Sequence, residues 1–358
     1  MKKESYYING LGIISPQKTF NNSEFLPEIT SYDTNVLMCV LPDFKEYINP
    51  IQLRRLSRML RIGLSSAIIC LRDSNNVMPD GIITGTGYGF LTETAKFVTE
   101  IYEYGEKQLT PTYFMQSTYN ALAGLVALTL KCKGYNNTYV NKGFAFETSL
   151  HDAMMQLNSN PTQTLLVGSF DEMDTAQYNI NSRIGHYRKE QVKNLLLFNE
   201  RLVGSLQGEG ASFFSISGTC TEQTWCVIKD IKMIFLPDSK EVLLTLLKDF
   251  LAASNTCVQD VDVVVSGVSG DIYNDKFINA IVGSEFATIP ELRFKHLCGE
   301  YCTASAFGTW LAASVLKKQE IPKGVQFNTV NARPFFKTAL LINQYMGRNY
   351  SFILLQRN

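Results

Sequence analysis

Thiols are the residues of this 358-residue chain whose type and spacing first suggest chemistry. Eight cysteines are scattered along the sequence, and only Cys298 and Cys302 lie close enough to share a site. His296 precedes them, which makes a thiol nucleophile one hypothesis, although neither cysteine has a histidine at the spacing known to activate a thiol. The remaining cysteines lack paired CxxC spacing, and several lie in apolar runs, such as AIICL around Cys70. We therefore expect neither a zinc site nor a disulfide scaffold.

A glycine-rich turn and an acidic turn are the next candidates for chemistry. Residues 80–94 read DGIITGTGYGFLTET, a short strand that opens into a glycine loop and a helix, an arrangement that can bind phosphate. GTGYG lacks the Walker lysine and the full GxGxxG spacing, so nucleotide binding at this loop is not favoured. Asp171 and Glu172 follow a buried strand in SFDEMD, and we expect them to belong to the scaffold rather than to perform acid–base catalysis.

The charge balance excludes several classes of function. Lys+Arg and Asp+Glu number 33 each, and no basic run is present, so we expect no nucleic-acid partner and no polybasic membrane patch. Charged residues make up only 18% of the chain, which indicates that much surface is buried in a thick core or against a partner subunit. No apolar stretch reaches 18 residues, so we expect no membrane span and, by default, a cytoplasmic location.

The elements that must position these residues alternate between strands and helices. Residues 6–16 predict a strand interrupted by Gly10 and Gly12, and residues 51–72 predict one amphipathic helix. Twice, at 143–157 and 299–316, a short loop leads into a helix rich in small residues. This order predicts an α/β fold with a largely buried sheet and an internal duplication. No low-complexity linker separates the two halves, which we place at 1–218 and 219–358 around one shared core.

Seven motifs, in order, resemble those of the β-ketoacyl synthase branch of the thiolase-like superfamily. They are YINGLGIISP, RRLSRMLRIG, GTGYGFLTET, NALAGLVALTLKCKG, LLVGSFDEMD, LQGEGASFFSI and INQYMGRNYSFILLQ. The resemblance covers nearly the whole chain, residues 6 to 356. It implies a thiolase-like αβαβα five-layer fold built from two related halves.

The resemblance also locates the family's catalytic groups, and all three are replaced here. Such synthases use a cysteine at a strand-to-helix elbow, which accepts an acyl chain from a carrier protein as a thioester, and two histidines that support decarboxylation. The cysteine position falls on Gly143, and a one-residue shift would place Lys142 or Phe144 there. Ser266 and Glu300 stand at the histidine positions, and an ionised carboxylate cannot donate a hydrogen bond. The three histidines of the chain, His151, His186 and His296, lie elsewhere.

The residues around the vacated site have open interpretations. Phe144 and Phe146 either fill the space that the missing groups leave, or line or end an acyl tunnel. Glu147 lies further into the helix. Lys295 matches a family lysine that supports the active site, and we expect it to be structural here, paired with Glu300 or with Glu147.

Loss of all three groups on a persistent scaffold is typical of a chain-length factor, an inactive paralogue that pairs with an active synthase. The resemblance implies a non-catalytic subunit that forms a heterodimer with an active ketosynthase, contacts an acyl carrier protein and shapes the acyl tunnel. The pathway would be polyketide, aryl polyene, flexirubin-type or fatty-acid-like biosynthesis. The tyrosine-rich segment 102–114 falls where the family has dimer-interface and tunnel elements. No cofactor or metal is implied.

Two alternatives stay open at this point. The first is an enzyme with altered acyl-thioester chemistry, an acyltransferase or hydrolase that uses Glu147, Glu300 or a thiol. The second is a homodimeric lipid-binding protein.

Overall fold

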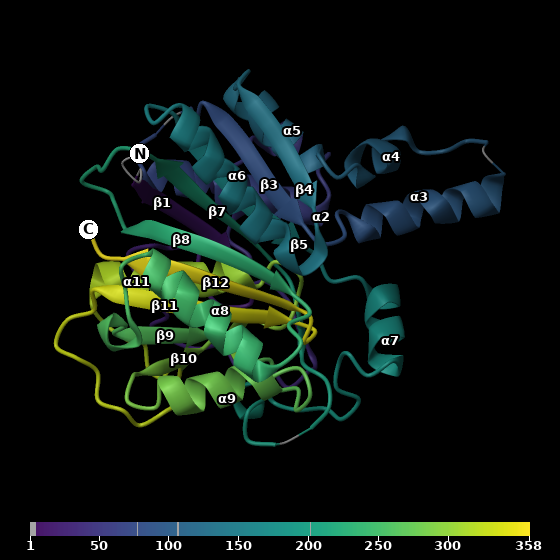
Figure 1. Ribbon diagram of the computed structural model, residues 1–358. Helices are drawn as coiled ribbons and strands as arrows, with labels where there is room; N and C mark the ends of the chain where they lie inside the picture. Colours follow the sequence, from purple (N-terminus) through teal and green to yellow (C-terminus); the bar gives the residue numbers. More distant parts are fainter. Residues whose placement is uncertain (1–4, 77, 106, 201) are drawn as a thin grey trace.

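Ten strands form one mixed sheet in the computed structural model, which describes residues 5–76, 78–105, 107–200 and 202–358 (Figure 1). The N-terminal half contributes β1 (Tyr6–Ile14), β3 (Gly81–Thr86), β4 (Tyr135–Val140), β5 (Thr164–Asp171) and β7 (Gly210–Ser217). The C-terminal half contributes β8 (Cys226–Phe235), β9 (Val263–Ser266), β10 (Glu291–Arg293), β11 (Thr338–Tyr345) and β12 (Asn349–Gln356). Two short strands, β2 (Val36–Leu37) and β6 (Gln207–Gly208), pair separately. The α/β fold class expected from the sequence is confirmed.

The two halves of the sheet have the same strand order. If the five strands of each half are numbered along the chain, their order across the sheet is first, fifth, fourth, second, third. This order is β1-β7-β5-β3-β4 in the N-terminal half and β8-β12-β11-β9-β10 in the C-terminal half. The halves join where Tyr6–Ile8 of β1 pairs antiparallel with residues 226–228 of β8. A repeated order of this kind is what an internal duplication produces. The boundary at residue 218 falls between β7 and β8, although a division into domains stays a prediction.

Alternating side chains on the strands create three hydrophobic cores and five layers. On β9, Val263 and Val265 face a central core, whereas Val264 faces an outer one. Helices α6 (Ala145–Ser159) and α11 (Ser305–Lys318) share the central core with both halves of the sheet. The outer faces are covered by α2 (Arg58–Asp73) and α5 (Ala121–Leu130) on the N-terminal half, and by α8 (Lys240–Ala253) and α9 (Lys276–Glu285) on the C-terminal half. The result is the αβαβα arrangement.

Two local predictions were wrong. Gly10 and Gly12 do not interrupt β1, because their role is to let α2 approach the strand closely: a Cβ on Gly12 would overlap the carbonyl oxygen of Ser66. The single helix expected over 51–72 is two helices, α1 (Pro50–Leu53) and α2, since Ser57 between them has extended backbone with ψ of 162°.

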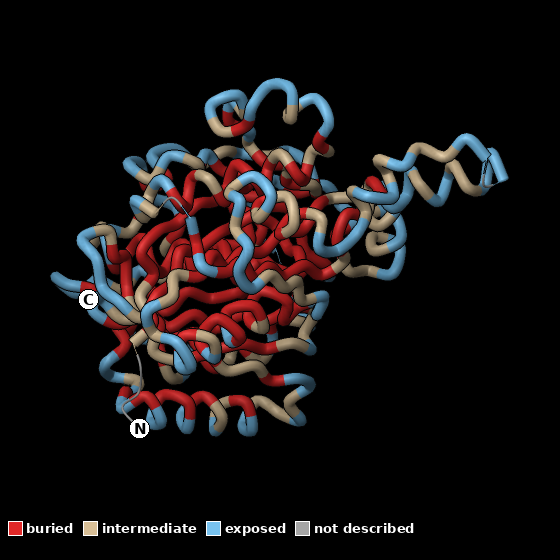
Figure 2. Tube along the Cα trace, turned by 90° about the horizontal axis from the view of Figure 1, so that it is seen from above, coloured by how far each residue is buried: buried red, intermediate tan, exposed pale blue. Residues whose placement is uncertain are grey.

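A helical arm extends from the N-terminal half. It consists of α3 (Leu91–Tyr104) and α4 (Pro111–Ser117), which pack on each other and project away from the body (Figure 1). Its outer part is largely exposed (Figure 2), and Tyr102 exposes 90% of its surface. Val98 and Met115 are exposed as well, and so is Phe114 although its ring centroid lies 5.4 Å from that of Phe97, so the arm presents apolar surface to its surroundings.

The remaining helices are short: α7 (Thr175–Arg183) and α10 (Lys295–Cys298), with 3-10 turns at Phe44–Glu46, Lys142–Phe144, Asn194–Leu196 and Val258–Asp260. Over the residues that the structure describes, no helix combines the length and the apolarity needed to cross a bilayer.

Candidate functional site

The turn between β4 and α6 carries the predicted nucleophile position. β4 ends at Val140, a single 3-10 turn spans Lys142–Phe144, and α6 begins at Ala145. Lys142 has a φ of +43°, a left-handed conformation that side chains other than glycine rarely adopt. Gly143 is buried at this elbow, and it has no side chain to form a thioester.

Tyr345 fills the space beside Gly143. A Cβ placed on Gly143 would lie 2.7 Å from both Cβ and Cδ1 of Tyr345, closer than real Cβ atoms approach other heavy atoms. Tyr345 is buried at the end of β11. The volume that a nucleophile's side chain would need is therefore taken by an aromatic ring. Tyr345 was not predicted as a site residue, because its only signal in the sequence is its place in the motif INQYMG.

Tyr345 belongs to a group of tyrosines around Cys302. Tyr88, Tyr187, Tyr301, Tyr345 and Cys302 line a cavity of only about 10 Å³, which is at the limit for one water molecule and far too small for an acyl chain. Burial, reinforced by the nearby Asp171 carboxylate, raises the pKa of the Cys302 thiol well above its usual value. A thiol held in its protonated form is a poor nucleophile.

Lys295 pairs with Glu300 rather than with Glu147. The Lys295 ammonium lies 2.7 Å from Oε2 of Glu300 and donates a second hydrogen bond of 2.5 Å to the carbonyl oxygen of Gln344. Both side chains are buried. Burial raises the pKa of Glu300 to about 7, although the Lys295 ammonium opposes this rise. Glu147 instead accepts a hydrogen bond of 2.7 Å from the Ser351 hydroxyl, and burial raises the pKa of Glu147 too.

Ser266 lies at the end of β9, next to the same strand as Tyr345. It is fully buried, and its hydroxyl has no partner within the described residues. The loop that follows it is bound by the Gln344 amide, which donates to the Ser269 hydroxyl at 3.2 Å and to Oδ1 of Asp275 at 3.0 Å. The positions of Gly143, Ser266 and Glu300 thus converge on the Gln344–Tyr345 end of β11.

The two phenylalanines after the elbow have different surroundings. Phe146 is fully buried in the central core, with its ring centroid 5.3 Å from that of Phe214. Phe144 is buried next to Gly143 at the start of α6. No imidazole joins this site from α10, because His296 Nε2 lies 3.0 Å from the carbonyl oxygen of Gly324 and burial lowers the pKa of His296 to about 4.

The acidic turn connects the two halves. One oxygen of Asp171 accepts from the Thr86 hydroxyl at 3.0 Å and the Gly87 amide at 2.8 Å, and the other accepts from the Thr303 amide and hydroxyl, each at 2.9 Å. Burial raises the pKa of Asp171 to about 6. The Gly87 amide of the glycine loop is therefore used to bind a carboxylate of the chain itself.

The pKa of Glu172, the second carboxyl of this turn, predicts how the stability of the protein depends on pH. Its Oε1 accepts a hydrogen bond of 2.7 Å from the Thr92 amide, and burial raises its pKa from 4.5 to about 7. A raised pKa means that the folded state keeps a proton that the unfolded state loses above pH 4.5, so this contribution to stability falls as pH rises from about 4.5 to 7. We expect Glu172→Gln, which is neutral at every pH, to be more stable than the wild type by about 2 kcal/mol at pH 8 and equally stable at pH 4.5.

Urea unfolding of both proteins across this pH range measures the difference. The exposed Glu241, in the first turn of α8, gives the control Glu241→Gln, which gains no stability at pH 8 because hydrogen bonds from its own backbone and from Ser239 lower the pKa of that carboxyl. A constant difference between Glu172→Gln and the wild type at all pH values would contradict the raised pKa.

In the described residues, no group of three or more His, Cys, Asp or Glu side chains is placed to hold a metal ion. All eight cysteines are free.

Comparison with known proteins shows a family match in the N-terminal half and a shared fold over nearly the whole chain. Residues 41–186 match the family model "Beta-ketoacyl synthase, N-terminal domain". The whole chain has the fold of "The ishigamide ketosynthase/chain length factor", with a TM-score of 0.79 at 15% identity over 99% of this chain and 100% of that one. The expected relation to β-ketoacyl synthases and the thiolase-like ketosynthase fold are therefore confirmed.

Two further solved structures have the same fold. One is a complex of a type II polyketide synthase acyl-carrier protein with its ketosynthase bound to the hexaketide, AntDE:AntF, with a TM-score of 0.79, 13% identity and full coverage of both chains. The other is a β-ketoacyl synthase from Burkholderia phymatum STM815, with a TM-score of 0.77 and 12% identity over 99% of this chain and 100% of that one. None of the curated proteins is significantly similar to this chain in sequence.

Proposed function

We propose that this chain is a non-catalytic ketosynthase paralogue, a chain-length factor that pairs with an active β-ketoacyl-[acyl-carrier-protein] synthase. The partner supplies the cysteine and both histidines, and this chain shapes the acyl tunnel of a polyketide, aryl polyene, flexirubin-type or fatty-acid-like pathway. The observation that carries the proposal is the packing of Tyr345 against Gly143, because it leaves the family's nucleophile position without both a thiol and the space for one.

The other two replaced positions support the same proposal. Glu300 is bound to Lys295, and neither it nor Ser266 offers the neutral imidazole donor that decarboxylation of a malonyl thioester requires. Cys298 and Cys302 are both buried, and burial raises the pKa of each thiol well above its usual value, which weighs against the alternative of a relocated nucleophile. Phe144, at the elbow, remains our candidate for a residue that borders the acyl tunnel.

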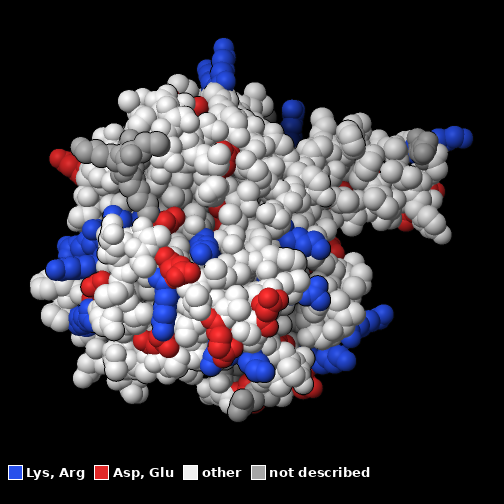
Figure 3. Space-filling model, in the orientation of Figure 1, with Lys and Arg blue, Asp and Glu red and all other residues white. Residues whose placement is uncertain are grey.

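The surface for the proposed partner is the free edge of the N-terminal half. β4 is the last strand of the sheet, and the Thr138 amide donates to the Asn137 side chain at 3.0 Å instead of to another strand. Apolar side chains are exposed beside this edge, including Leu128 on α5 and Val140 at the end of β4. Charged side chains are sparse over this part of the face shown in Figure 3 and denser over the C-terminal half. An apolar, weakly charged surface suits a permanent interface.

Co-expression with the nearest intact ketosynthase tests the proposal. We expect a one-to-one complex by size-exclusion chromatography with mass detection, and malonyl elongation only when both chains are present. The homologous solved structures include ketosynthase/chain-length-factor and carrier-protein complexes, which makes this partner the first to try. If the chain forms a homodimer that binds lipid and forms no complex with the synthase, the proposal is wrong and the lipid-binding alternative is favoured. An acyl adduct on this chain alone, detected by intact-protein mass spectrometry, would favour an acyltransferase or hydrolase.

A matched pair of valines tests the surface itself. Val140 and Val242 are similarly exposed, at 43% and 41%, but Val140 ends β4 and Val242 lies on α8, on the opposite half of the molecule. We expect Val140→Asp to weaken the complex at least about tenfold, because an interface that desolvates a carboxylate without a partner loses affinity. Val242→Asp leaves the affinity unchanged. Equal effects of the two substitutions would place the partner elsewhere.

A further inference from the structure

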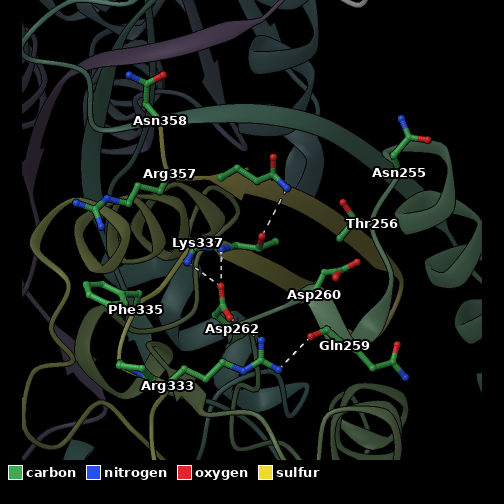
Figure 4. Close-up of a pocket in the computed structure, with 13 residues that line it drawn as sticks. Asn255, Thr256, Gln259, Asp260, Asp262, Arg333, Phe335, Lys337, Arg357 and Asn358 are labelled. Carbon is green, nitrogen blue, oxygen red and sulfur yellow. Dashed lines mark hydrogen bonds and ion pairs between the residues drawn. The ribbon is translucent and has the colours of Figure 1, made fainter.

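An open cavity of about 940 Å³ lies at the opposite end of the C-terminal half from the tyrosine cluster. It is formed where β11 begins at Thr338 and β12 ends at Gln356, whereas Tyr345 closes the other end of β11. Its walls come from the segment before β11, the end of β12 and the turn after α8 (Figure 4). Its volume is in the range of sites that bind small molecules.

Asp262 makes the floor of this cavity rigid. Its carboxylate accepts from the Lys337 amide at 2.7 Å, the Thr338 amide at 2.9 Å and the Arg333 guanidinium at 2.7 Å (Figure 4). Arg333 is fixed a second time, since it donates to the carbonyl oxygen of Gln259 at 3.0 Å. The Arg333–Asp262 pair is therefore electrically balanced and holds the surrounding backbone in place.

Two cations on the wall are not balanced in this way. Within the described chain, neither the Lys337 ammonium nor the Arg357 guanidinium has a hydrogen-bond or ion-pair partner, and both residues are exposed. The Arg357 amide donates to the Lys337 carbonyl oxygen at 2.8 Å, so the two residues are neighbours on adjacent strand ends. An anion that reaches both side chains would gain charge-assisted hydrogen bonds.

An aromatic side chain stands beside these cations. Phe335 is 62% exposed, whereas Phe336 next to it is buried and its amide donates to the Gln319 side chain at 2.9 Å. The backbone after Phe335 is held by the Phe336 amide, and before it the Arg333 side chain is bound to Asp262 and Gln259, so the segment that carries the exposed ring is anchored on both sides. Figure 4 shows Phe335, Lys337 and Arg357 on one side of Asp262, and Asn255, Thr256 and Asp260 on the other.

We propose that this cavity binds a nucleoside phosphate. The phosphate lies against Lys337 and Arg357, and the planar base stacks on Phe335. Asp260 fixes the orientation: hydrogen bonds from the Cys257 side chain and amide lower its pKa, so it is ionised and repels a phosphate from the far side. On that side the exposed Asn255 offers a neutral amide to a sugar, whereas the Thr256 hydroxyl is buried and donates to the carbonyl oxygen of Ser254 at 3.2 Å. This proposal does not depend on the proposed chain-length-factor function, because a nucleoside phosphate binds as a free molecule and not as a group attached to a carrier protein.

Calorimetric titration of the purified chain with ADP, adenosine and inorganic phosphate tests the site. We expect saturable binding of ADP that weakens as salt concentration rises, and weaker binding of the two fragments. Lys337→Ala and Arg357→Ala each reduce the affinity for ADP about tenfold or more, since each removes a charge-assisted hydrogen bond. Phe335→Ala reduces it about three- to tenfold.

Lys323→Ala is the matched control, because Lys323 is exposed but does not line the cavity. All four substitutions are at the surface, and thermal unfolding verifies that each variant is folded. No saturable heat with ADP, or the same affinity for ADP in Lys337→Ala and Lys323→Ala, would overturn the proposal. Binding of inorganic phosphate as tight as that of ADP would overturn the assignment of a nucleoside.

Discussion

Replacing Lys295 with methionine will lower the free energy of unfolding by about 3–5 kcal/mol at pH 8, because it removes one partner of a buried ion pair. The Glu300 carboxylate then loses the Lys295 ammonium that lies 2.7 Å from its Oε2, and the carbonyl oxygen of Gln344 loses the hydrogen bond from the same ammonium. Methionine fills a similar volume, so the loss reports the missing ammonium rather than a cavity. Urea unfolding at several pH values measures it.

The pH dependence separates this explanation from simple loss of packing. Burial already raises the pKa of Glu300 to about 7, and without Lys295 the carboxyl takes up its proton more readily still. The destabilisation is therefore smaller at pH 5.5, where the carboxyl is protonated, and grows as pH rises through 7. Adding Glu300→Gln to the Lys295→Met protein will restore part of the stability at pH 8. A loss that is the same at every pH, and that Glu300→Gln does not relieve, would contradict the buried pair.

The parts of the fold that the sequence predicted are those with local causes. The continuous apolar run VVV of β9 is what a strand buried on both faces requires, because successive side chains enter two different cores. The small residues of α11 allow a helix to be buried on every side, as nearly all of its residues are. Gly12 was misinterpreted because its neighbour, the Ser66 carbonyl, belongs to a helix some fifty residues later.

The residues of the candidate site likewise fall into those that could be predicted from the sequence and those that could not. Gly143, Ser266 and Glu300 were found through the resemblance to the family's motifs. Gly143 follows β4 and Ser266 ends β9, whereas Glu300 follows the short helix α10. The neighbour of Gly143 was not found, because Tyr345 meets Gly143 only after the two halves pack together. The choice of Glu300 over Glu147 as the partner of Lys295 likewise depends on where Ser351 of β12 lies.

Restoring the family's nucleophile by Gly143→Cys will not restore its chemistry, and it will lower the free energy of unfolding by about 3 kcal/mol. The new Cβ would lie 2.7 Å from atoms of Tyr345, whose ring is buried among Tyr88, Cys302 and the neighbouring strands and has no free space to move into. The His296 imidazole does not serve the position, since its Nε2 is directed to the carbonyl oxygen of Gly324. Urea unfolding, and intact-protein mass spectrometry after incubation with an acyl-carrier thioester, measure the two effects.

Two further variants test whether the collision with Tyr345 causes the loss of stability: Gly143→Cys in a Tyr345→Ala protein, and Gly283→Cys. In a Tyr345→Ala protein the same Gly143→Cys substitution will cost much less stability, because the ring it collides with is gone; the difference between the two costs is the coupling energy of the pair. Gly283→Cys on α9 is the matched control, since a Cβ there meets no atom within 4 Å and the substitution is tolerated. If Gly143→Cys were as stable as Gly283→Cys and became acylated at the introduced thiol, the nucleophile position would be open rather than closed. The proposal of a subunit built around a closed nucleophile position would then fail.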